Sequence, residues 1–171
     1  LGAGSAEQAG EPLAGIQAEF GSDPAYAALD QEIRQAQLSQ QSTRRITELL
    51  GKARSALAAG KISEPAGNNA FDWYEQARQV DSSNAEVNDF KQTLATRILE
   101  EAKSAQSSAD VEAALDRSEL ALRVDPNLEA AVQIRDSAQK ALDTQRAEIA
   151  SKVNLARSSI ASGRLVPPAT D

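Results

Sequence analysis

The chain of 171 residues contains no cysteine, no histidine and no methionine. Without cysteine it has no disulfide framework, no thiolate metal site and no cysteine nucleophile. Without histidine it lacks the commonest general base, the commonest metal ligand and the usual pH-sensitive side chain. These absences argue against an enzyme, so we expect no catalytic residue, no metal site and no cofactor.

The charge and hydropathy of the chain narrow the classes of partner. Its net charge of −7 argues against nucleic acid and anionic lipid, because proteins bind both mainly through Lys and Arg contacts to phosphate. No apolar run approaches the roughly 18–20 residues that a bilayer span needs, so we expect no direct membrane insertion. The chain begins at Leu1 without a signal-peptide pattern, and we interpret it as an excised piece or a processed product.

Aromatic residues are also few, at 4%, and much of the 41% hydrophobic content is alanine. Small side chains let helices approach one another closely. Aromatic and β-branched residues nowhere alternate with polar residues for any distance, as they would in a strand. The composition therefore predicts an all-α protein.

Prolines and small polar residues divide the chain into segments. Residues 1–11 are small and polar and are expected to form a flexible tail or linker, ahead of a helical repeat domain over 12–171. Within that domain the spacing of apolar residues by three and four predicts helices at about 12–20, 24–59, 70–80, 85–105, 109–124 and 127–162.

Several helix ends carry recognisable capping residues. Asp23-Pro24 and Asp125-Pro126 are each interpreted as an N-cap followed by a proline in the first helical turn. Gly60 is expected to end the first long helix, because glycine adopts the left-handed conformation that closes many helices. The helices are therefore expected to meet in turns.

A repeat of 103 residues relates the middle of the chain to its end. Residues 53–68, ARSALAAGKISEPAGN, match residues 156–171, ARSSIASGRLVPPATD, at seven of sixteen positions. The segment 60–69, GKISEPAGNN, is interpreted as a connector between two helices that recurs with the architecture, and contact with a partner is the alternative. Asn68 or Asn69 is expected to cap the helix that follows. We interpret the chain as a fragment of a longer repeat array.

A shorter repeat of 44 residues lies within the chain. Its pattern is alanine, then an aromatic four residues later, then alanine three residues after that, with Asp at the following turn. The two alanines lie seven residues apart on one face and allow a neighbouring helix to approach closely. Ala70, Tyr74, Ala77, Val80 and Asp81 fall on Ala114, Ser118, Ala121, Val124 and Asp125.

These features resemble the tetratricopeptide (TPR) repeat, in which two antiparallel helices form a hairpin. Residues 71–87 resemble its second helix most closely, and residues 115–131 keep the register but carry Ser118 in place of an aromatic. The Asp landmarks at 23, 81 and 125 are 58 and 44 residues apart, longer than the roughly 34 residues of a standard repeat. The residues expected to pack between helices are Leu50, Gly51, Ala53, Ala70, Tyr74, Ala77, Ala114 and Ala121.

The resemblance implies stacked antiparallel hairpins, an α-solenoid, with two long helices that each link one repeat to the next. It also implies a non-catalytic scaffold that binds a protein or peptide. The chain is similar to repeat regions of bacterial envelope proteins, which favours the periplasm or cell envelope. The alternative function is a structural spacer that self-associates through coiled-coil-like contacts of its long helices, as a homo-oligomer.

Two features are candidates for partner binding. Trp73 lies off the face shared by Phe71 and Tyr74, so it is interpreted either as half-buried against a neighbouring repeat or as an anchor for a partner. The segment 44–61 is basic within an acidic chain, which indicates either a solvated face or recognition of an acidic tail. Its candidate binding residues are Arg44, Arg45, Lys52 and Arg54.

Overall fold

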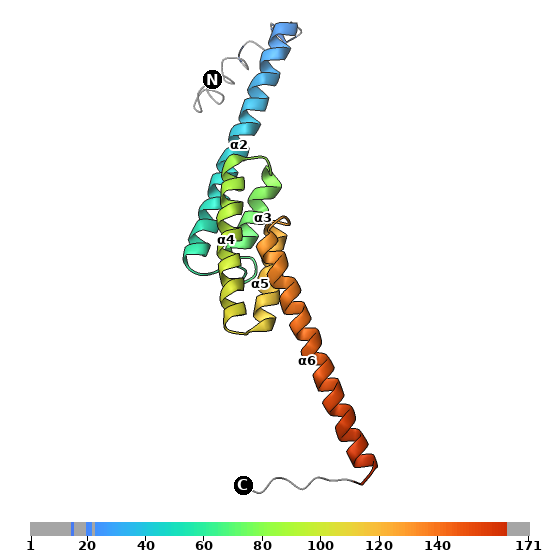
Figure 1. Cartoon of the computed structure of the whole chain (residues 1–171). Helices are drawn as coiled ribbons and strands as arrows, with labels where there is room; N and C mark the ends of the chain where they lie inside the picture. Colours follow the sequence, from blue (N-terminus) through green and yellow to red (C-terminus); the bar gives the residue numbers. More distant parts are fainter. Residues whose placement is uncertain (1–14, 16–19, 22, 164–171) are drawn as a thin grey trace. The chain divides into compact units, whose positions relative to one another are not determined.

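The structure, a computed structural model, describes residues 15, 20, 21 and 23–163. The expected tail over 1–11 and most of the short helix expected over 12–20 lie outside the described residues. The described part is all-α and contains no strand, which confirms the prediction of an all-α protein. Its long helices are α2 (Pro24–Ala58), α3 (Ala70–Val80), α4 (Ala85–Ser107), α5 (Val111–Val124) and α6 (Glu129–Ala161) (Figure 1).

The capping residues of α2 act as the sequence predicts. The Asp23 carboxylate accepts a hydrogen bond of 2.7 Å from the amide of Ala25, and Pro24 occupies the first turn. At the other end, Gly60 has a φ of 72°. The Gly60 amide donates to the Leu57 carbonyl and the Lys61 amide donates to the Ala56 carbonyl. This pair of bonds is the Schellman motif, which satisfies carbonyls that the helix itself leaves unpaired.

The prediction that Asp125-Pro126 caps the last helix is wrong. Helix α6 begins at Glu129, and Asp125 lies in the turn before it. The Asp125 amide donates to Ala121, and its carbonyl accepts from Leu128. Because leucine offers no side-chain acceptor, α6 has no side-chain cap at its start.

The same turn occurs 44 residues earlier, between α3 and α4. There the Asp81 amide donates to Ala77, and the Asp81 carbonyl accepts from Asn84. Asn84 takes the position of Leu128 and does cap its helix, since its side chain accepts from the amide of Glu86 at 2.9 Å. The shorter repeat therefore corresponds to one turn geometry used twice.

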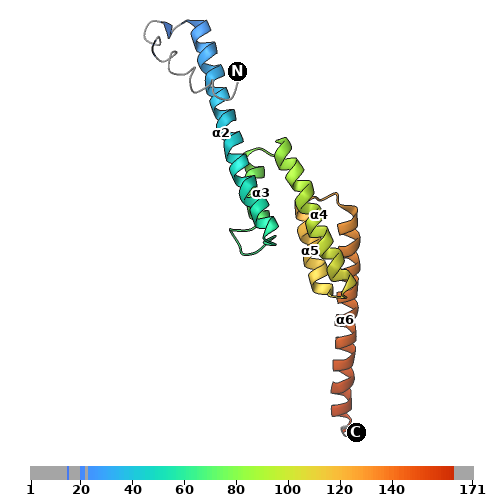
Figure 2. The ribbon, with the colours of Figure 1, turned by 90° about the vertical axis from the view of Figure 1, so that its left-hand side faces the viewer.

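The described residues form two compact units, one that ends at Lys91 and one that begins at Gln92. In the first unit, α3 packs against the C-terminal half of α2 (Figure 2). The start of α4 joins the same core, where the Phe90 ring lies 6.2 Å from the Tyr74 ring. The buried residues that make this core include Ile46, Leu49, Leu50, Ala53, Ala70, Tyr74, Ala77, Val87 and Phe90.

The second unit has an alanine-rich core between the remainder of α4, α5 and the first half of α6. Its buried cluster is Ala102, Ala114, Ile134 and Ala138, with Leu99, Ala105, Val111 and Leu115 packed against it. Ser118, which replaces Tyr74 in the shorter repeat, is fully buried and donates a 2.8 Å hydrogen bond to the Leu115 carbonyl. The two units thus bury equivalent positions with different side chains.

Just after the end of α4, Ala109 adopts a backbone conformation that favours glycine. Ala109 has a φ of 58°, and the amides of Ala109 and Asp110 donate to Gln106 and Ala105 in a second Schellman motif. Alanine pays a steric cost in this conformation that glycine does not. We expect Ala109→Gly to raise the free energy of unfolding by about 0.5–1 kcal/mol, measured by thermal unfolding followed by circular dichroism. Gly60→Ala is the matched control and is expected to lower stability; an unchanged or lowered melting temperature in Ala109→Gly would contradict the assignment.

Candidate functional site

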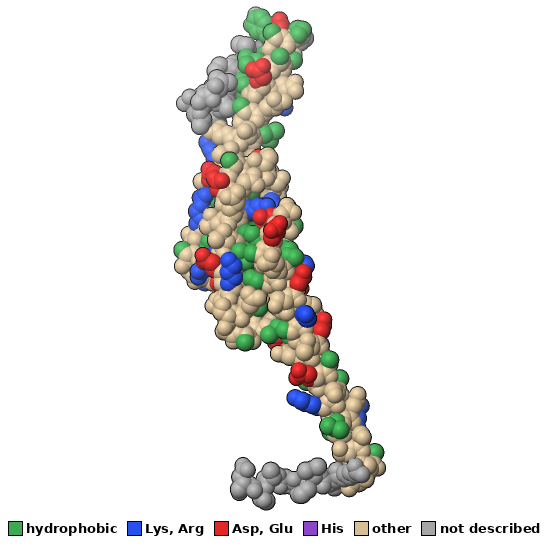
Figure 3. All heavy atoms as spheres, viewed as in Figure 1, with side chains coloured by type: hydrophobic (Ala, Val, Ile, Leu, Met, Phe, Trp, Pro, Cys, Tyr) green, Lys and Arg blue, Asp and Glu red, His purple; other side chains and the backbone are tan. Residues whose placement is uncertain are grey.

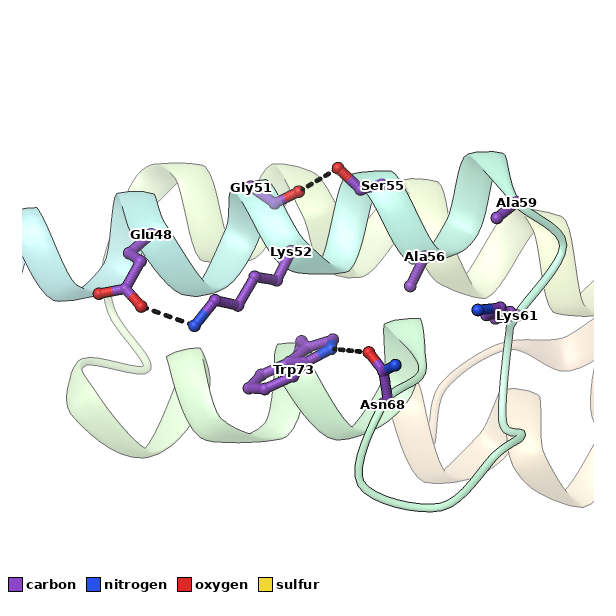
Figure 4. A pocket seen from close by; sticks show the side chains of 9 residues that line it. All are labelled: Glu48, Gly51, Lys52, Ser55, Ala56, Ala59, Lys61, Asn68 and Trp73. Carbon is purple, nitrogen blue, oxygen red and sulfur yellow. Dashed lines mark hydrogen bonds and ion pairs between the residues drawn. The ribbon is translucent and has the colours of Figure 1, made fainter.

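An open groove of about 470 Å³ lies on the first unit, between α2, the 60–69 loop and α3. Figure 4 shows its lining side chains, with Lys52 from α2 lying over Trp73 from α3. The small residues of the lining are Gly51 and Ala56 of α2 and Ala59, which follows the helix. The full lining is Glu48, Gly51, Lys52, Ser55, Ala56, Ala59, Lys61, Asn68 and Trp73. We call this set the Trp73 groove.

One buried side chain, Asn69, holds the loop that walls the Trp73 groove. It is 1% exposed, and its amide nitrogen donates to the carbonyls of Ser63 and Pro65, both at 3.0 Å, and to the Asp72 carboxylate at 2.6 Å. Its carbonyl oxygen accepts from the Asp72 amide at 2.8 Å and so caps α3. Asn69, rather than Asn68, is therefore the cap.

Backbone bonds fasten the rest of the loop to the start of α3. The amides of Ala70 and Phe71 donate to the carbonyls of Lys61 and Ile62 at 2.8 and 2.9 Å, and the Ile62 side chain is buried. This confirms that segment 60–69 connects one helix to the next, and it shows that backbone hydrogen bonds join the connector to the start of α3. Asn68, which does not cap the helix, instead lines the groove and accepts from the Trp73 indole at 3.4 Å.

The Trp73 ring and the Lys52 ammonium form the centre of the groove. Lys52 Nζ lies 4.9 Å from the centroid of the ring, within the range of a cation–π interaction. The same Nζ bonds the Glu48 carboxylate at 2.6 Å. Trp73 is half-buried, so one part of the indole supports the fold while the other part faces the groove.

Lys52 also sets the charge state of its neighbour. Its hydrogen bond and its charge, with a smaller contribution from Arg45, lower the pKa of Glu48. A lowered folded-state pKa means that this pairing is complete above the ordinary pKa of a glutamate and is lost as the pH falls through the folded value. The pair is exposed and adds little to stability. Its main consequence is that a carboxylate already occupies one side of Lys52 at neutral pH.

The other basic candidates do not gather at the groove. Arg45 pairs with Glu48 at 3.3 Å, and Arg54 pairs with Glu86 at the start of α4 at 3.7 Å. Arg44 lines a separate shallow hollow on α2 with Gln37, Gln40 and Gln41. Of the sequence candidates, the structure brings only Lys52 and Trp73 together. It adds Asn68 and Ser55, and it places Lys61, the last residue of the basic segment 44–61, in the same groove.

The residues expected to pack between helices are buried, with one exception. Leu50, Ala53, Ala70, Tyr74, Ala77, Ala114 and Ala121 are all at most 2% exposed. Gly51 is exposed, and a Cβ atom built there would meet nothing within 4 Å. The expectation fails for Gly51 because each residue turns about 100° around a helix, which carries Gly51 off the face of Leu50 and into the groove.

The described residues bring together no group of three or more Asp or Glu side chains placed to hold a metal ion. None of the described helices combines the length and the apolar character needed to cross a membrane. Compared with protein-family models, with curated proteins and with solved structures, the chain gives no match. The geometry of the site combines an aromatic face, two ammonium groups and three small residues, Gly51, Ala56 and Ala59.

Proposed function

We propose that the chain is a non-catalytic protein-interaction module, and that the Trp73 groove binds an acidic peptide segment of a partner protein. The observation that carries the proposal is the placement of Lys52 against a half-exposed Trp73 ring, in a groove that also holds Lys61. Tryptophan and basic side chains in such positions are typical anchors of protein interfaces. The groove is open and shallow, which suits a peptide better than a small metabolite.

The lining accounts for a preference for acidic residues. A ligand carboxylate can take the place of Glu48 on Lys52 or bind Lys61, because an ammonium group has three hydrogen-bond donors. An apolar side chain next to that carboxylate can lie on the exposed part of the indole. Gly51, Ala56 and Ala59 leave room for a ligand backbone to approach α2 closely.

The wider architecture is proposed to be TPR-like. The support is the turn used at both Asp81 and Asp125, and the burial of equivalent alanines in α3 and α5. Hairpins of this kind stack through neighbouring repeats and serve as scaffolds. On this proposal the chain is a scaffold of a bacterial assembly, in the periplasm or cell envelope, as its sequence resemblance suggests.

A selection experiment tests the proposed groove directly, because it needs no identified partner. Random dodecapeptides displayed on phage are selected on the immobilised chain and eluted by competition. We expect enriched peptides to carry Asp or Glu beside an apolar residue, and to lose most of their binding when the bait is Lys52→Ala or Trp73→Ala. Arg44→Ala is the matched control, since Arg44 lies in the separate hollow. Enriched peptides that bind the Lys52→Ala bait unchanged would contradict the proposal.

The alternative function is a structural spacer that self-associates. Its support is the length of α2 and α6, with 35 and 33 residues, and the exposed apolar residues on α6. Sedimentation over a range of concentrations separates the two functions. A chain that stays monomeric disfavours the spacer, whereas a concentration-dependent dimer supports it.

Substitution of Gly51, the exposed glycine of the groove, is predicted to raise stability and to lower peptide affinity. Glycine inside a helix costs about 0.5–1 kcal/mol relative to alanine, and nothing in the fold crowds position 51. We expect Gly51→Ala to raise the free energy of unfolding by that amount and to weaken binding of a selected peptide, because the added methyl group narrows the groove. Thermal unfolding and a peptide titration measure the two effects. A variant that is more stable and binds equally well would show that ligand backbone does not approach this point.

A further inference from the structure

The C-terminal part of α6 repeats the C-terminal part of α2, which is the helix that α3 covers. The repeat of 103 residues aligns Ile46, Leu50, Ala53, Leu57 and Gly60 with Ile149, Val153, Ala156, Ile160 and Gly163. The two helices also end alike, since Gly60 and Gly163 have φ angles of 72° and 67°. The amide of each glycine donates to the aligned residue three positions earlier, Leu57 in α2 and Ile160 in α6.

The aligned side chains of α2 and α6 differ in whether another helix covers them. In α2, Ile46, Leu50 and Ala53 are at most 2% exposed, because α3 packs on them. In α6, Ile149 is 62% exposed, Val153 42% and Ile160 67%. The helix runs back along α5 and continues past the first residues of α5 in both views (Figures 1 and 2), and hydrophobic side chains lie at its surface (Figure 3). We call Ile149, Val153, Ala156 and Ile160 the α6 stripe.

We infer that the α6 stripe is a docking face for a helix of the α3 type, supplied by a partner protein. The chain itself shows what covers this set of side chains, because the aligned stripe of α2 is covered by α3. Such a partner helix carries two small residues seven positions apart and a large aromatic between them, as Ala70, Tyr74 and Ala77 do in α3. The inference is independent of the proposed groove, which uses other residues of another helix.

The side chains of the stripe explain why the partner must have this pattern. Ala53 in α2 is fully buried and leaves space for the small residues of α3 to approach, and Ala156 leaves the same space on α6. The residue aligned with Lys52 is Leu155, which is 69% exposed. In the first unit Lys52 covers the Trp73 ring, so on α6 an apolar leucine replaces the cation. A partner helix with an aromatic or aliphatic residue at the Trp73 position is therefore preferred over one with an acidic residue there.

The probe for this test is the chain's own α3. A fluorescein-labelled synthetic peptide of residues 61–84 is titrated against the full chain and followed by fluorescence anisotropy. We expect saturable binding, weakened at least about tenfold by Val153→Asp, because the new carboxylate would be buried without a partner. Ser151→Asp places the same charge on the opposite, exposed face of α6 and is the matched control. Val153→Asp is expected to leave peptide binding at the Trp73 groove unchanged, which separates this inference from the proposed function.

A fused variant covers the case in which the free peptide is too weakly helical to bind. Residues 61–84 are joined directly after Gly163, and hydrogen exchange of the amides over 149–160 is measured. We expect exchange to slow by about tenfold relative to the same fusion carrying Val153→Asp. Binding that Val153→Asp does not change, or the failure of both the peptide and the fusion, would overturn the inference. So would a dimer of the unmodified chain that Val153→Asp dissociates, because the cover would then be a second copy.

Discussion

Asn69→Asp is expected to destabilise the first unit by roughly 3–5 kcal/mol at neutral pH. The two side chains have the same shape, but aspartate cannot donate a hydrogen bond. The change places a buried carboxylate against the Asp72 carboxylate and against two carbonyl oxygens, at positions that are now 2.6–3.0 Å from an amide nitrogen. The free energy of unfolding of a whole domain is only about 5–15 kcal/mol. A loss of this size therefore removes a large part of the stability of the loop and α3. Urea unfolding at pH 7, followed by Trp73 fluorescence, measures the effect.

The pH dependence of the stability of Asn69→Asp tests whether the introduced negative charge is what destabilises the variant. Burial and a neighbouring negative charge raise the pKa of the introduced carboxyl group in the folded state. A raised folded-state pKa means that stability is lost as the pH rises above the unfolded value, near 3.9, and is regained as the pH falls towards it. The difference in stability between Asn69→Asp and the unchanged chain should therefore shrink between pH 7 and pH 4. Asn68→Asp, one residue away at the exposed groove, should cost less than about 1 kcal/mol; equal losses in the two variants would show that Asn69 does not hold the loop.

Tyr74→Ala is expected to cost about 3–5 kcal/mol, the range for removing a large aromatic side chain from a core. Tyr74 is 2% exposed and lies at the meeting point of α2, α3 and the start of α4, with the Phe90 ring beside it. The substitution leaves a cavity in this core, and the cost of such a cavity adds to the lost burial of the ring. We expect fast hydrogen exchange throughout α3 and a lower urea midpoint for the Trp73 signal.

Ser118→Ala is the matched control in the second unit, because Ser118 holds the position aligned with Tyr74. Its hydroxyl bonds only a carbonyl of its own helix, that of Leu115, so its loss should cost less than about 1 kcal/mol. If Tyr74→Ala were as mild as Ser118→Ala, the stability of the first unit would not depend on this aromatic side chain.

The helices themselves could be predicted from the sequence, because helix formation depends on local chemistry. Asp23, Gly60 and the stripe through Leu50 and Ala53 act within a few residues of themselves, and the structure places each of them as expected. The start of α6 was not predictable from Asp125-Pro126, since the same Asp-containing turn can either cap a helix or precede it. The Asp125 amide donates to Ala121 at the end of α5, and its carboxylate accepts from the Asn127 amide, so Asp125 belongs to the turn before α6.

The sequence predicted the two main residues of the groove but not their contact. Trp73 stood out as the chain's single tryptophan, and Lys52 as part of a basic segment. Their contact requires that α3 lie alongside α2 at one register, which the Asn69 network and the buried Ile62 set through the loop. Sequence spacing carries no information on that register, so it could not show that Lys61 and Asn68 line the same groove as Trp73.

The most direct test of the binding account uses Trp73 as its own reporter, because the chain has no other tryptophan. An acidic peptide from the selection is titrated against the chain while indole fluorescence is followed. The account predicts a saturable change, with affinity lowered about tenfold by Lys52→Ala and raised by Glu48→Gln, since Glu48 competes for Lys52. A peptide that binds all three proteins equally, or that binds without any change in the indole signal, would contradict it.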